Sequence, residues 1–263
     1  MAVDKPLSTI NNPNLPDLTR KDNYRTEPLL VAIVFIAFTI YVTWRAFENQ
    51  FFDTYALHGT LISPLYSPEF NVPWMLFGKH ISPALFILPV PLLFRATCYY
   101  YRKAYYRAFF MDPYACAVKE PFVRKGYTGE RQFPLIAQNI HRYAFYLAAI
   151  VMAILWWDTI LAFTKTTPTG ATSLGITVGS IIFLVNVVLL SFYTFSCHSW
   201  RHLAGGCVDC FSKAPARHSI WERITHLNEN HMLWAWCSLF SVALTDLYVR
   251  CVAAHLFPDM RIF

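Results

Sequence analysis

The run from Leu174 to Phe195 reads LGITVGSIIFLVNVVLLSFYTF, and it continues directly into Ser196 to Cys210, which reads SCHSWRHLAGGCVDC. The first part has the apolarity and length of a helix that crosses a hydrocarbon layer of about 30 Å, which takes about 20 helical residues. The second part holds five Cys and His side chains within fourteen residues. Thiolates and imidazoles are ligands that hold zinc, copper, haem iron and iron–sulfur clusters. A membrane helix therefore ends in a segment that carries the side chains of a metal or redox site.

The whole chain is more apolar than a soluble domain. Of its 263 residues, 56% are hydrophobic and 14% are charged, whereas soluble domains have about 45–50% apolar and about 25% charged residues. The first 28 residues are polar and lack the short apolar segment of a cleaved signal peptide. The seven cysteines are an odd number, which favours reduced thiols or metal ligands over a secreted disulfide framework.

Five apolar runs have the length, or nearly the length, that is needed to cross a membrane. In lipid each run must satisfy its own backbone hydrogen bonds, which predicts helices. We therefore expect an all-α membrane protein in which residues 29–263 form a bundle of five transmembrane helices and residues 1–28 form a cytoplasmic tail. The predicted helices are Leu29–Phe47, Ile81–Tyr100, Tyr143–Phe163, Leu174–Phe195 and Leu233–Val252.

Lysine and arginine are divided unevenly between the two sides of this bundle. The N-terminal tail and the second and fourth loops hold fifteen, whereas the opposite side holds three, Lys79, Lys165 and Arg261. Cytoplasmic loops carry the excess of positive charge, which predicts a cytoplasmic N-terminus. The net charge of +6 is thus explained by topology, and we predict no nucleic-acid partner.

Two further features concern the shape of the bundle. The outer loop from Glu48 to His80 is aromatic and too apolar for a free loop, so we expect it to lie in the membrane interface or to cap the bundle. Asp246 and Arg250 lie four residues apart on one helix face and are expected to pair. A kink is predicted in the outer half of the second helix, because proline interrupts the helical hydrogen bonds. Its prolines are Pro83, Pro89 and Pro91.

Ligand-type side chains from several segments are predicted to meet at the cytoplasmic face. Cys98 lies four residues before Arg102, and Cys197 lies four residues before Arg201. Both thiols should therefore lie about one turn inside the basic boundary. Ionisable groups at membrane depth are costly unless they are used. The candidate ligands are Cys98, Cys116, Cys197, His141, His198, His202 and His231.

Simpler interpretations exist for single members of this set and for other cysteines. A buried cysteine often packs as a small hydrophobe, and this interpretation is favoured for Cys237 and Cys251. A histidine that opens a helix can be a polar cap. Cys207 and Cys210 have the two-residue spacing of many zinc sites, but the histidines that follow are poorly spaced to complete four ligands. The convergence of many such residues on one face is the stronger argument.

Several segments also carry a resemblance to a known family. They are Phe94-Arg-Ala-Thr-Cys-Tyr-Tyr-Tyr-Arg-Lys-Ala-Tyr-Tyr-Arg107, Asp112-Pro-Tyr-Ala-Cys116, Gln138-Asn-Ile-His-Arg-Tyr143, Cys197-His-Ser-Trp-Arg-His202 and Asn230-His-Met-Leu-Trp-Ala-Trp236. On these segments, and from about residue 29 to the end, the chain resembles the cytochrome b-like membrane anchor of actinobacterial and mycobacterial succinate dehydrogenase of type F, which is a single chain of five helices.

The resemblance implies a function for the chain. It would be the membrane anchor of a succinate:quinone oxidoreductase (respiratory complex II) in the plasma membrane, bound to a flavoprotein subunit and an iron–sulfur subunit on the cytoplasmic side. It would not act on succinate itself, and it would pass electrons to menaquinone. The expected quinone-binding residues are Arg95, Tyr99 and Trp234.

The resemblance also implies a Rieske-type [2Fe–2S] cluster within the anchor. Such a cluster takes two Cys on one iron and two His on the other. Depth favours Cys98 with Cys197 as the thiolates, whereas the family motif gives equal weight to Cys116. The imidazoles would come from His141, His198, His202 and His231.

Two alternatives remain open from the sequence. The same four histidines could supply the axial ligands of a b-type haem. The chain could also be a structural anchor without a cofactor that forms only part of a quinone site. The sequence shows no Gly-rich phosphate loop and no pattern that favours hydrolase chemistry.

Overall fold

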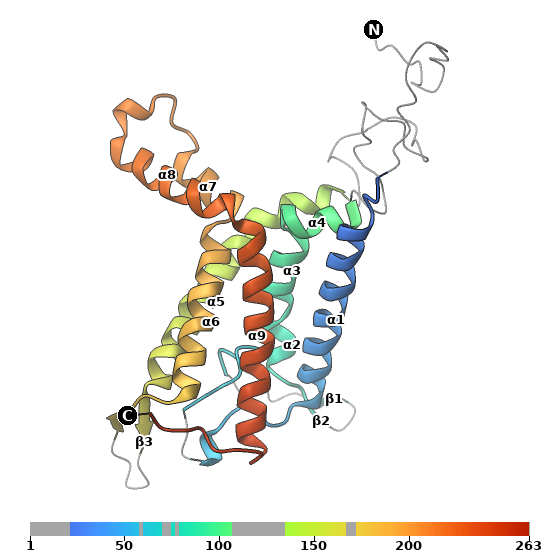
Figure 1. Ribbon diagram of the computed structural model, residues 1–263, viewed down its shortest axis with the longest axis vertical. Coiled ribbons are helices and arrows are strands. Elements are labelled where there is room, and N and C mark those ends of the chain that lie inside the picture. Colours follow the sequence, from blue (N-terminus) through green and yellow to red (C-terminus); the bar gives the residue numbers. More distant parts are fainter. Residues whose placement is uncertain are drawn as a thin grey trace.

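The computed structural model describes residues 22–57, 60–69, 75–76, 79–106, 135–166 and 172–262. Four long helices run side by side along the molecule (Figure 1). Each is long and apolar enough to cross a membrane; at 1.5 Å per residue, a helix of this length spans about 30 Å. Four of the five predicted crossings are thus confirmed as long apolar helices. They are α1 (Thr26–Glu48), α5 (His141–Ala162), α6 (Val178–Phe195) and α9 (His231–Ala253).

The second predicted crossing is divided into three shorter helices. These are α2 (Ala84–Ile87), α3 (Pro89–Thr97) and α4 (Tyr99–Tyr106). The break between α2 and α3 coincides with the prolines of the predicted kink, which have no N–H to donate. The expectation of one helix from Ile81 to Tyr100 is confirmed only as a shorter apolar helix, Ala84–Thr97, because α3 ends at Thr97 and the backbone of Cys98 is extended, with ψ 136°.

The chain folds in a similar way after α6. Cys197 is again extended, with ψ 144°, and α7 (His198–Gly205) begins directly after it. A 3-10 turn, η4 (Phe211–Lys213), and α8 (Pro215–Glu229) follow. In Figure 1, α7 and α8 project from the end of the bundle at which α4 lies. The remaining elements are short: η2 (Tyr55–Leu57), η3 (Leu135–Ile140), an antiparallel pair β1 (Met75–Leu76) and β2 (Lys79–His80), and an antiparallel pair β3 (Thr164–Thr166) and β4 (Thr172–Leu174).

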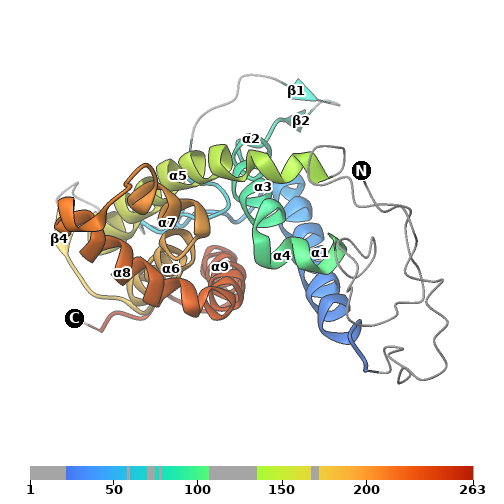
Figure 2. The same cartoon turned by 90° about the horizontal axis from the view of Figure 1, so that it is seen from above.

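The positions of the first helix and of the C-terminus agree with the predicted division of the loops between the two ends of the bundle. The start of α1 lies at the same end of the bundle as α4, α7 and α8, and the C-terminus lies at the opposite end (Figure 1). In the view from above, α6 lies against both α5 and α9 (Figure 2). Helix α1 lies next to α4, on the side of α4 that is away from α6. Most of the predicted tail and most of the second loop lie outside the described residues.

The described part of the outer loop packs into the bundle, as expected. Leu61 and Tyr66 are buried, and the hydroxyl of Tyr66 donates to the carbonyl oxygen of Arg45 at 2.7 Å. The predicted pair of Asp246 and Arg250 is confirmed, with the arginine Nε 2.8 Å from the carboxylate. These contacts join the loop, α1 and α9 at the end of the bundle that is remote from α7.

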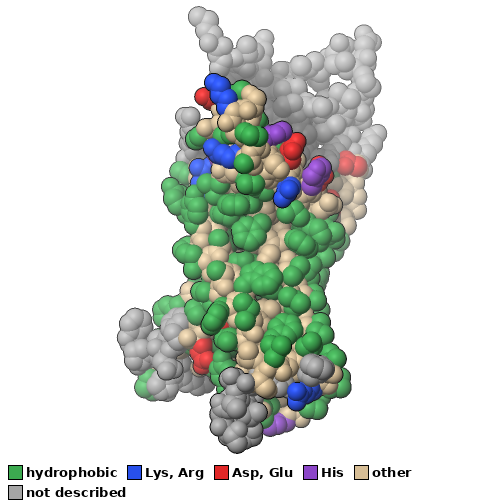
Figure 3. Space-filling view, turned by 90° about the vertical axis from the view of Figure 1, so that its left-hand side faces the viewer, with side chains coloured by type: hydrophobic (Ala, Val, Ile, Leu, Met, Phe, Trp, Pro, Cys, Tyr) green, Lys and Arg blue, Asp and Glu red, His purple; other side chains and the backbone are tan. Residues whose placement is uncertain are grey.

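The outward surface of the bundle is apolar. Ile33, Ile36 and Ile40 on α1 are more than half exposed. Figure 3 shows hydrophobic side chains over the middle of the face in view, with charged side chains and histidines toward the two ends. A soluble protein rarely leaves so large an apolar area uncovered, so these faces contact lipid and the chain is an integral membrane protein.

Candidate metal centre

Two breaks between helices place the two central cysteines. Cys98 separates α3 from α4, Cys197 separates α6 from α7, and both are 1% exposed. Each cysteine carbonyl accepts the first hydrogen bond of the next helix, from Arg102 N at 2.8 Å and from Arg201 N at 3.1 Å. Both cysteines therefore occupy the N-cap position of a helix. If the helix continued through either point, its cysteine would be an ordinary residue within a helix instead of the residue at the bend between two helices.

Two histidines face these thiols, each from the first residue of a long helix. The Cys98 Sγ lies 3.2 Å from Nε2 of His231, which begins α9. The Cys197 Sγ lies 3.0 Å from Nε2 of His141, which begins α5. Four donors from four separate parts of the sequence thus form two thiol–imidazole pairs.

The residue before each cysteine makes a hydrogen bond to the histidine of the other thiol–imidazole pair. Thr97 Oγ1 donates to the Leu93 carbonyl at 2.7 Å, which leaves it to accept from Nδ1 of His141 at 2.8 Å. Ser196 Oγ lies 2.6 Å from Nδ1 of His231 and donates to a carbonyl of its own helix. These contacts assign the Nδ1–H tautomer to both rings. The Nε2 lone pair of each ring then faces a thiol, and the Nδ1–H of each ring is held by an oxygen acceptor, as is usual for a metal-binding histidine.

Aromatic rings cover the faces of both imidazoles. Phe94 stacks on His141 with ring centroids 4.9 Å apart, and Tyr193 stacks on His231 at 5.2 Å. The Tyr193 hydroxyl is buried and makes no hydrogen bond within the described residues. A buried donor without an acceptor is rare in native proteins, and here it belongs to the ring that stacks on His231.

The structure describes two of the other predicted ligands, His198 and His202. His198 and His202 are exposed on α7, and Nδ1 of His202 contacts a guanidinium nitrogen of Arg142 at 2.7 Å. Cys116 lies outside the described residues. Cys207 and Cys210 are exposed. The members of the predicted set that the structure brings together are therefore Cys98, Cys197, His141 and His231.

The predicted quinone-binding residues differ in their surroundings. Arg95 is buried, Tyr99 is 71% exposed, and Trp234 is half-buried. The Nε1 atom of Trp234 is buried and has no hydrogen-bond partner within the described residues. It is a free donor one turn along α9 from His231.

Sequence reasoning missed Thr97, Ser196 and Tyr193. A hydroxyl residue precedes each central cysteine, and this repeated doublet could have drawn attention to the first two. Within the described residues, no group of three or more Cys, His, Asp or Glu side chains has the arrangement for a single metal ion. A two-iron cluster needs only two protein donors on each iron, so the donor set fits such a cluster better than one ion.

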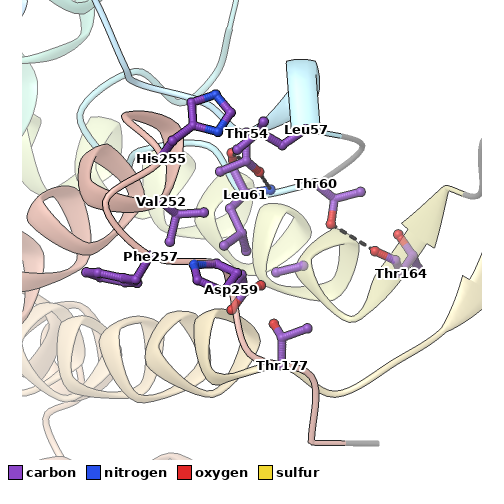
Figure 4. Close-up of a pocket in the computed structure, with 12 residues that line it drawn as sticks. Thr54, Leu57, Thr60, Leu61, Thr164, Thr177, Val252, His255, Phe257 and Asp259 are labelled. Carbon is purple, nitrogen blue, oxygen red and sulfur yellow. Dashed lines mark hydrogen bonds between the residues drawn. The ribbon is translucent and has the colours of Figure 1, made fainter.

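A cavity of about 440 Å³ lies at the other end of the bundle (Figure 4). Its lining includes residues at the ends of α5 and α9, the N-cap residue of α6 and residues of the described outer loop. The Asp259 carboxylate at its edge accepts hydrogen bonds from Gly179 N at 2.9 Å and from the Tyr248 hydroxyl at 2.8 Å. The length of the helices separates this cavity from the cysteines and histidines.

The fold and the buried donors define a membrane-embedded subunit with a candidate redox site at one end. Residues 26–255 match the family described as actinobacterial succinate dehydrogenase subunit SdhC, and the chain belongs to this family. A chain of the Mycobacterium smegmatis Sdh1 complex in the apo form is 40% identical, with a TM-score of 0.81, over 98% of this chain and 99% of that chain. No curated protein matches the sequence. The protein is therefore a membrane subunit of a succinate dehydrogenase complex.

Proposed function

We propose that this subunit anchors the flavoprotein and iron–sulfur subunits of the complex and passes their electrons to menaquinone through a Rieske-type [2Fe–2S] cluster. Cys98 and Cys197 would hold one iron and His141 and His231 the other. When bound, such a cluster supplies one-electron transfer at a potential above that of all-thiolate clusters. The observation that carries the proposal is the pair of crossed contacts between these thiols and imidazoles.

The surroundings of the four donors support a cluster more than a haem. Both Nε2 atoms are directed at a sulfur, whereas axial haem ligands would face each other across an open plane. The Tyr193 hydroxyl, which has no partner within the described residues, is a donor available to a cluster sulfur. Thr97 and Ser196 would hold the two ring ligands in orientation through their Nδ1 atoms.

The sidedness of the protein belongs to the same proposal. We place the end that carries α4, α7 and α8 in the cytoplasm, because the basic loops belong to that end. The soluble subunits would dock there, next to the four donors. A short path then leads from the soluble redox centres to Cys98 and Cys197.

Iron and acid-labile sulfide, measured on the purified whole complex, test the cluster. We expect a Rieske-like electron paramagnetic resonance (EPR) signal, which Cys98→Ser and Cys197→Ser should each abolish. The matched control is Cys237→Ser, a half-buried thiol in the second turn of α9, which should leave the signal intact. A haem band in the reduced-minus-oxidised spectrum, or quinone reduction that survives both cysteine variants, would reject the proposal.

We further propose that Trp234 donates a hydrogen bond to a quinone carbonyl, because its buried Nε1 has no partner within the described residues. Trp234→Phe leaves an aromatic ring next to Phe192, whose ring centroid lies 4.8 Å from that of Trp234, and removes the N–H donor together with part of the ring. We expect a higher KM for quinone with an unchanged EPR signal. An unchanged KM would remove Trp234 from the site.

A further inference from the structure

Arg95 is a buried cation in the last turn of α3, three residues before Cys98. Its side chain is 4% exposed. The guanidinium donates to the Tyr101 hydroxyl at 3.1 Å, to the Ala235 carbonyl at 3.1 Å and to Ser238 Oγ at 2.9 Å. All of these acceptors are neutral groups, so the hydrogen bonds satisfy the N–H donors without neutralising the charge.

The other buried arginine among the described residues, Arg250, has its charge neutralised by carboxylates. Arg250 contacts two carboxylates, Asp246 at 2.8 Å and Glu48 at 3.3 Å. Within the described residues, no carboxylate lies within 4.0 Å of an Arg95 nitrogen. A buried charge is costly unless an opposite charge lies nearby. The C-terminal end of α3 offers only the partial negative charge of a helix dipole.

The charge of Arg95 is directed at the proposed cluster site through one aromatic ring. The guanidinium carbon lies 4.4 Å from the centre of the Tyr193 ring. The same ring stacks on His231, with centroids 5.2 Å apart and an angle of 16° between the planes. A single tyrosine therefore separates the cation from one ligand, in surroundings where water does not screen the field.

We propose that Arg95 is the fixed counter-charge of the redox centre, and that it raises the reduction potential without being a ligand. This inference rests on the proposed function. Two ferric ions, two sulfides, two thiolates and two neutral imidazoles sum to zero charge. One electron, taken from the iron–sulfur subunit and later given to quinone, brings the sum to −1 with no proton taken up. The cation favours this reduced form, and the buried arginine gains its missing opposite charge at the same time.

The alternative is that Arg95 only ties α3, α4 and α9 together through its hydrogen bonds. Two substitutions separate charge from hydrogen bonding. Arg95→Gln removes the charge, whereas Arg95→Lys keeps it and loses the planar set of donors. Ser238→Ala removes one hydrogen bond and leaves the charge in place. Ser238→Asp keeps an acceptor for this hydrogen bond and neutralises the charge, because it adds a carboxylate next to the intact guanidinium.

The test is a potentiometric titration of the cluster EPR signal in the purified whole complex. We expect Arg95→Gln and Ser238→Asp each to lower the equilibrium constant for reduction about tenfold, which is about 59 mV for one electron. Arg95→Lys and Ser238→Ala should stay near the wild-type potential. The control Arg45→Gln removes a cation at the opposite end of the bundle and should also leave the potential unchanged.

The outcomes distinguish the two proposals. If the wild-type complex contains no cluster, the proposed function fails. If the cluster is present and its potential is the same in Arg95→Gln as in the wild type, the counter-charge role is overturned and Arg95 is a structural tie. Ser238→Asp answers the question on its own if Arg95→Gln does not assemble, because the guanidinium and its place between the helices are retained.

Discussion

The hydroxyl of Thr97 controls which nitrogen of His141 is available to a metal. Because it already donates to Leu93, it accepts from Nδ1–H and leaves Nε2 free for a ligand bond. Ser196 does the same for His231. Two small residues, neither of which would touch a metal, thus set the tautomers of both candidate imidazole ligands.

Thr97→Val should therefore weaken cluster retention. The substitution keeps the shape of the side chain and leaves Nδ1 of His141 without its acceptor. Loss of such an outer partner lowers metal affinity by about 10–100-fold. The measurement is iron per complex after dialysis against a chelator. Thr159→Val on α5, whose hydroxyl bonds only its own helix at 2.8 Å, is the control and should retain iron at the wild-type level.

Cys210 differs from the central cysteines because its thiol is exposed and has a lowered pKa. The Ser212 hydroxyl lies 2.9 Å from its sulfur, and hydrogen bonds from Ser212 lower the pKa of the Cys210 thiol below its ordinary value. A lower pKa means that the thiolate is present at lower pH. We expect Ser212→Ala to shift the alkylation profile of Cys210 toward higher pH. The measurement is the rate at which Cys210 reacts with iodoacetamide as a function of pH, in a Cys207→Ser background. If Ser212→Ala leaves this pH profile unchanged, the hydrogen bond is absent in solution.

At the scale of elements, the outer loop is joined to two helices through one carboxylate. Asp246 on α9 accepts from the Tyr41 hydroxyl of α1 at 2.6 Å, from the Ser63 hydroxyl of the loop, and from Arg250. The Asp246 side chain is 0% exposed. The outer loop, α1 and α9 therefore share one polar junction.

Removal of this carboxylate should destabilise the bundle. Breaking a buried ion pair costs about 3–5 kcal/mol, and we expect Asp246→Ala to cost about 3 kcal/mol, because Glu48 still contacts Arg250. The thermal unfolding midpoint of the complex in detergent should fall. Tyr41→Phe, which removes a single hydrogen bond worth about 1 kcal/mol, should lower the midpoint much less. Equal midpoints for both variants would contradict the junction.

The sequence predicted the long helices better than the corners between them. Apolarity and length identify α1, α5, α6 and α9, since membrane helices satisfy their own backbone hydrogen bonds. The breaks at Cys98 and Cys197 have no such signature, because cysteine is not a preferred N-cap residue. Depth alone suggested that these two thiols lie at a similar level of the bundle. It could not select His141 and His231 over the α7 histidines, because that choice depends on how four elements pack.

For the whole molecule, the proposed orientation predicts which thiols can be reached from each side of the membrane. A membrane-impermeant maleimide should label Cys207 and Cys210 in inside-out vesicles and not in right-side-out vesicles. Both thiols are exposed and follow α7. Leu256→Cys, at a position that is 72% exposed near the opposite end of the bundle, should show the reverse pattern. Labelling of Cys210 from the outside would invert the proposed topology.

The crossed pairing of donors has a consequence for biosynthesis. Cys98 meets its histidine only after the final long helix has been synthesised, because His231, the last of the four donors, begins α9. A ribosome-bound chain that ends before α9 would present one thiol–imidazole pair and a lone Cys98. Loading of the proposed iron–sulfur cluster would then be a late event, because all four donors are present only after α9 has been synthesised.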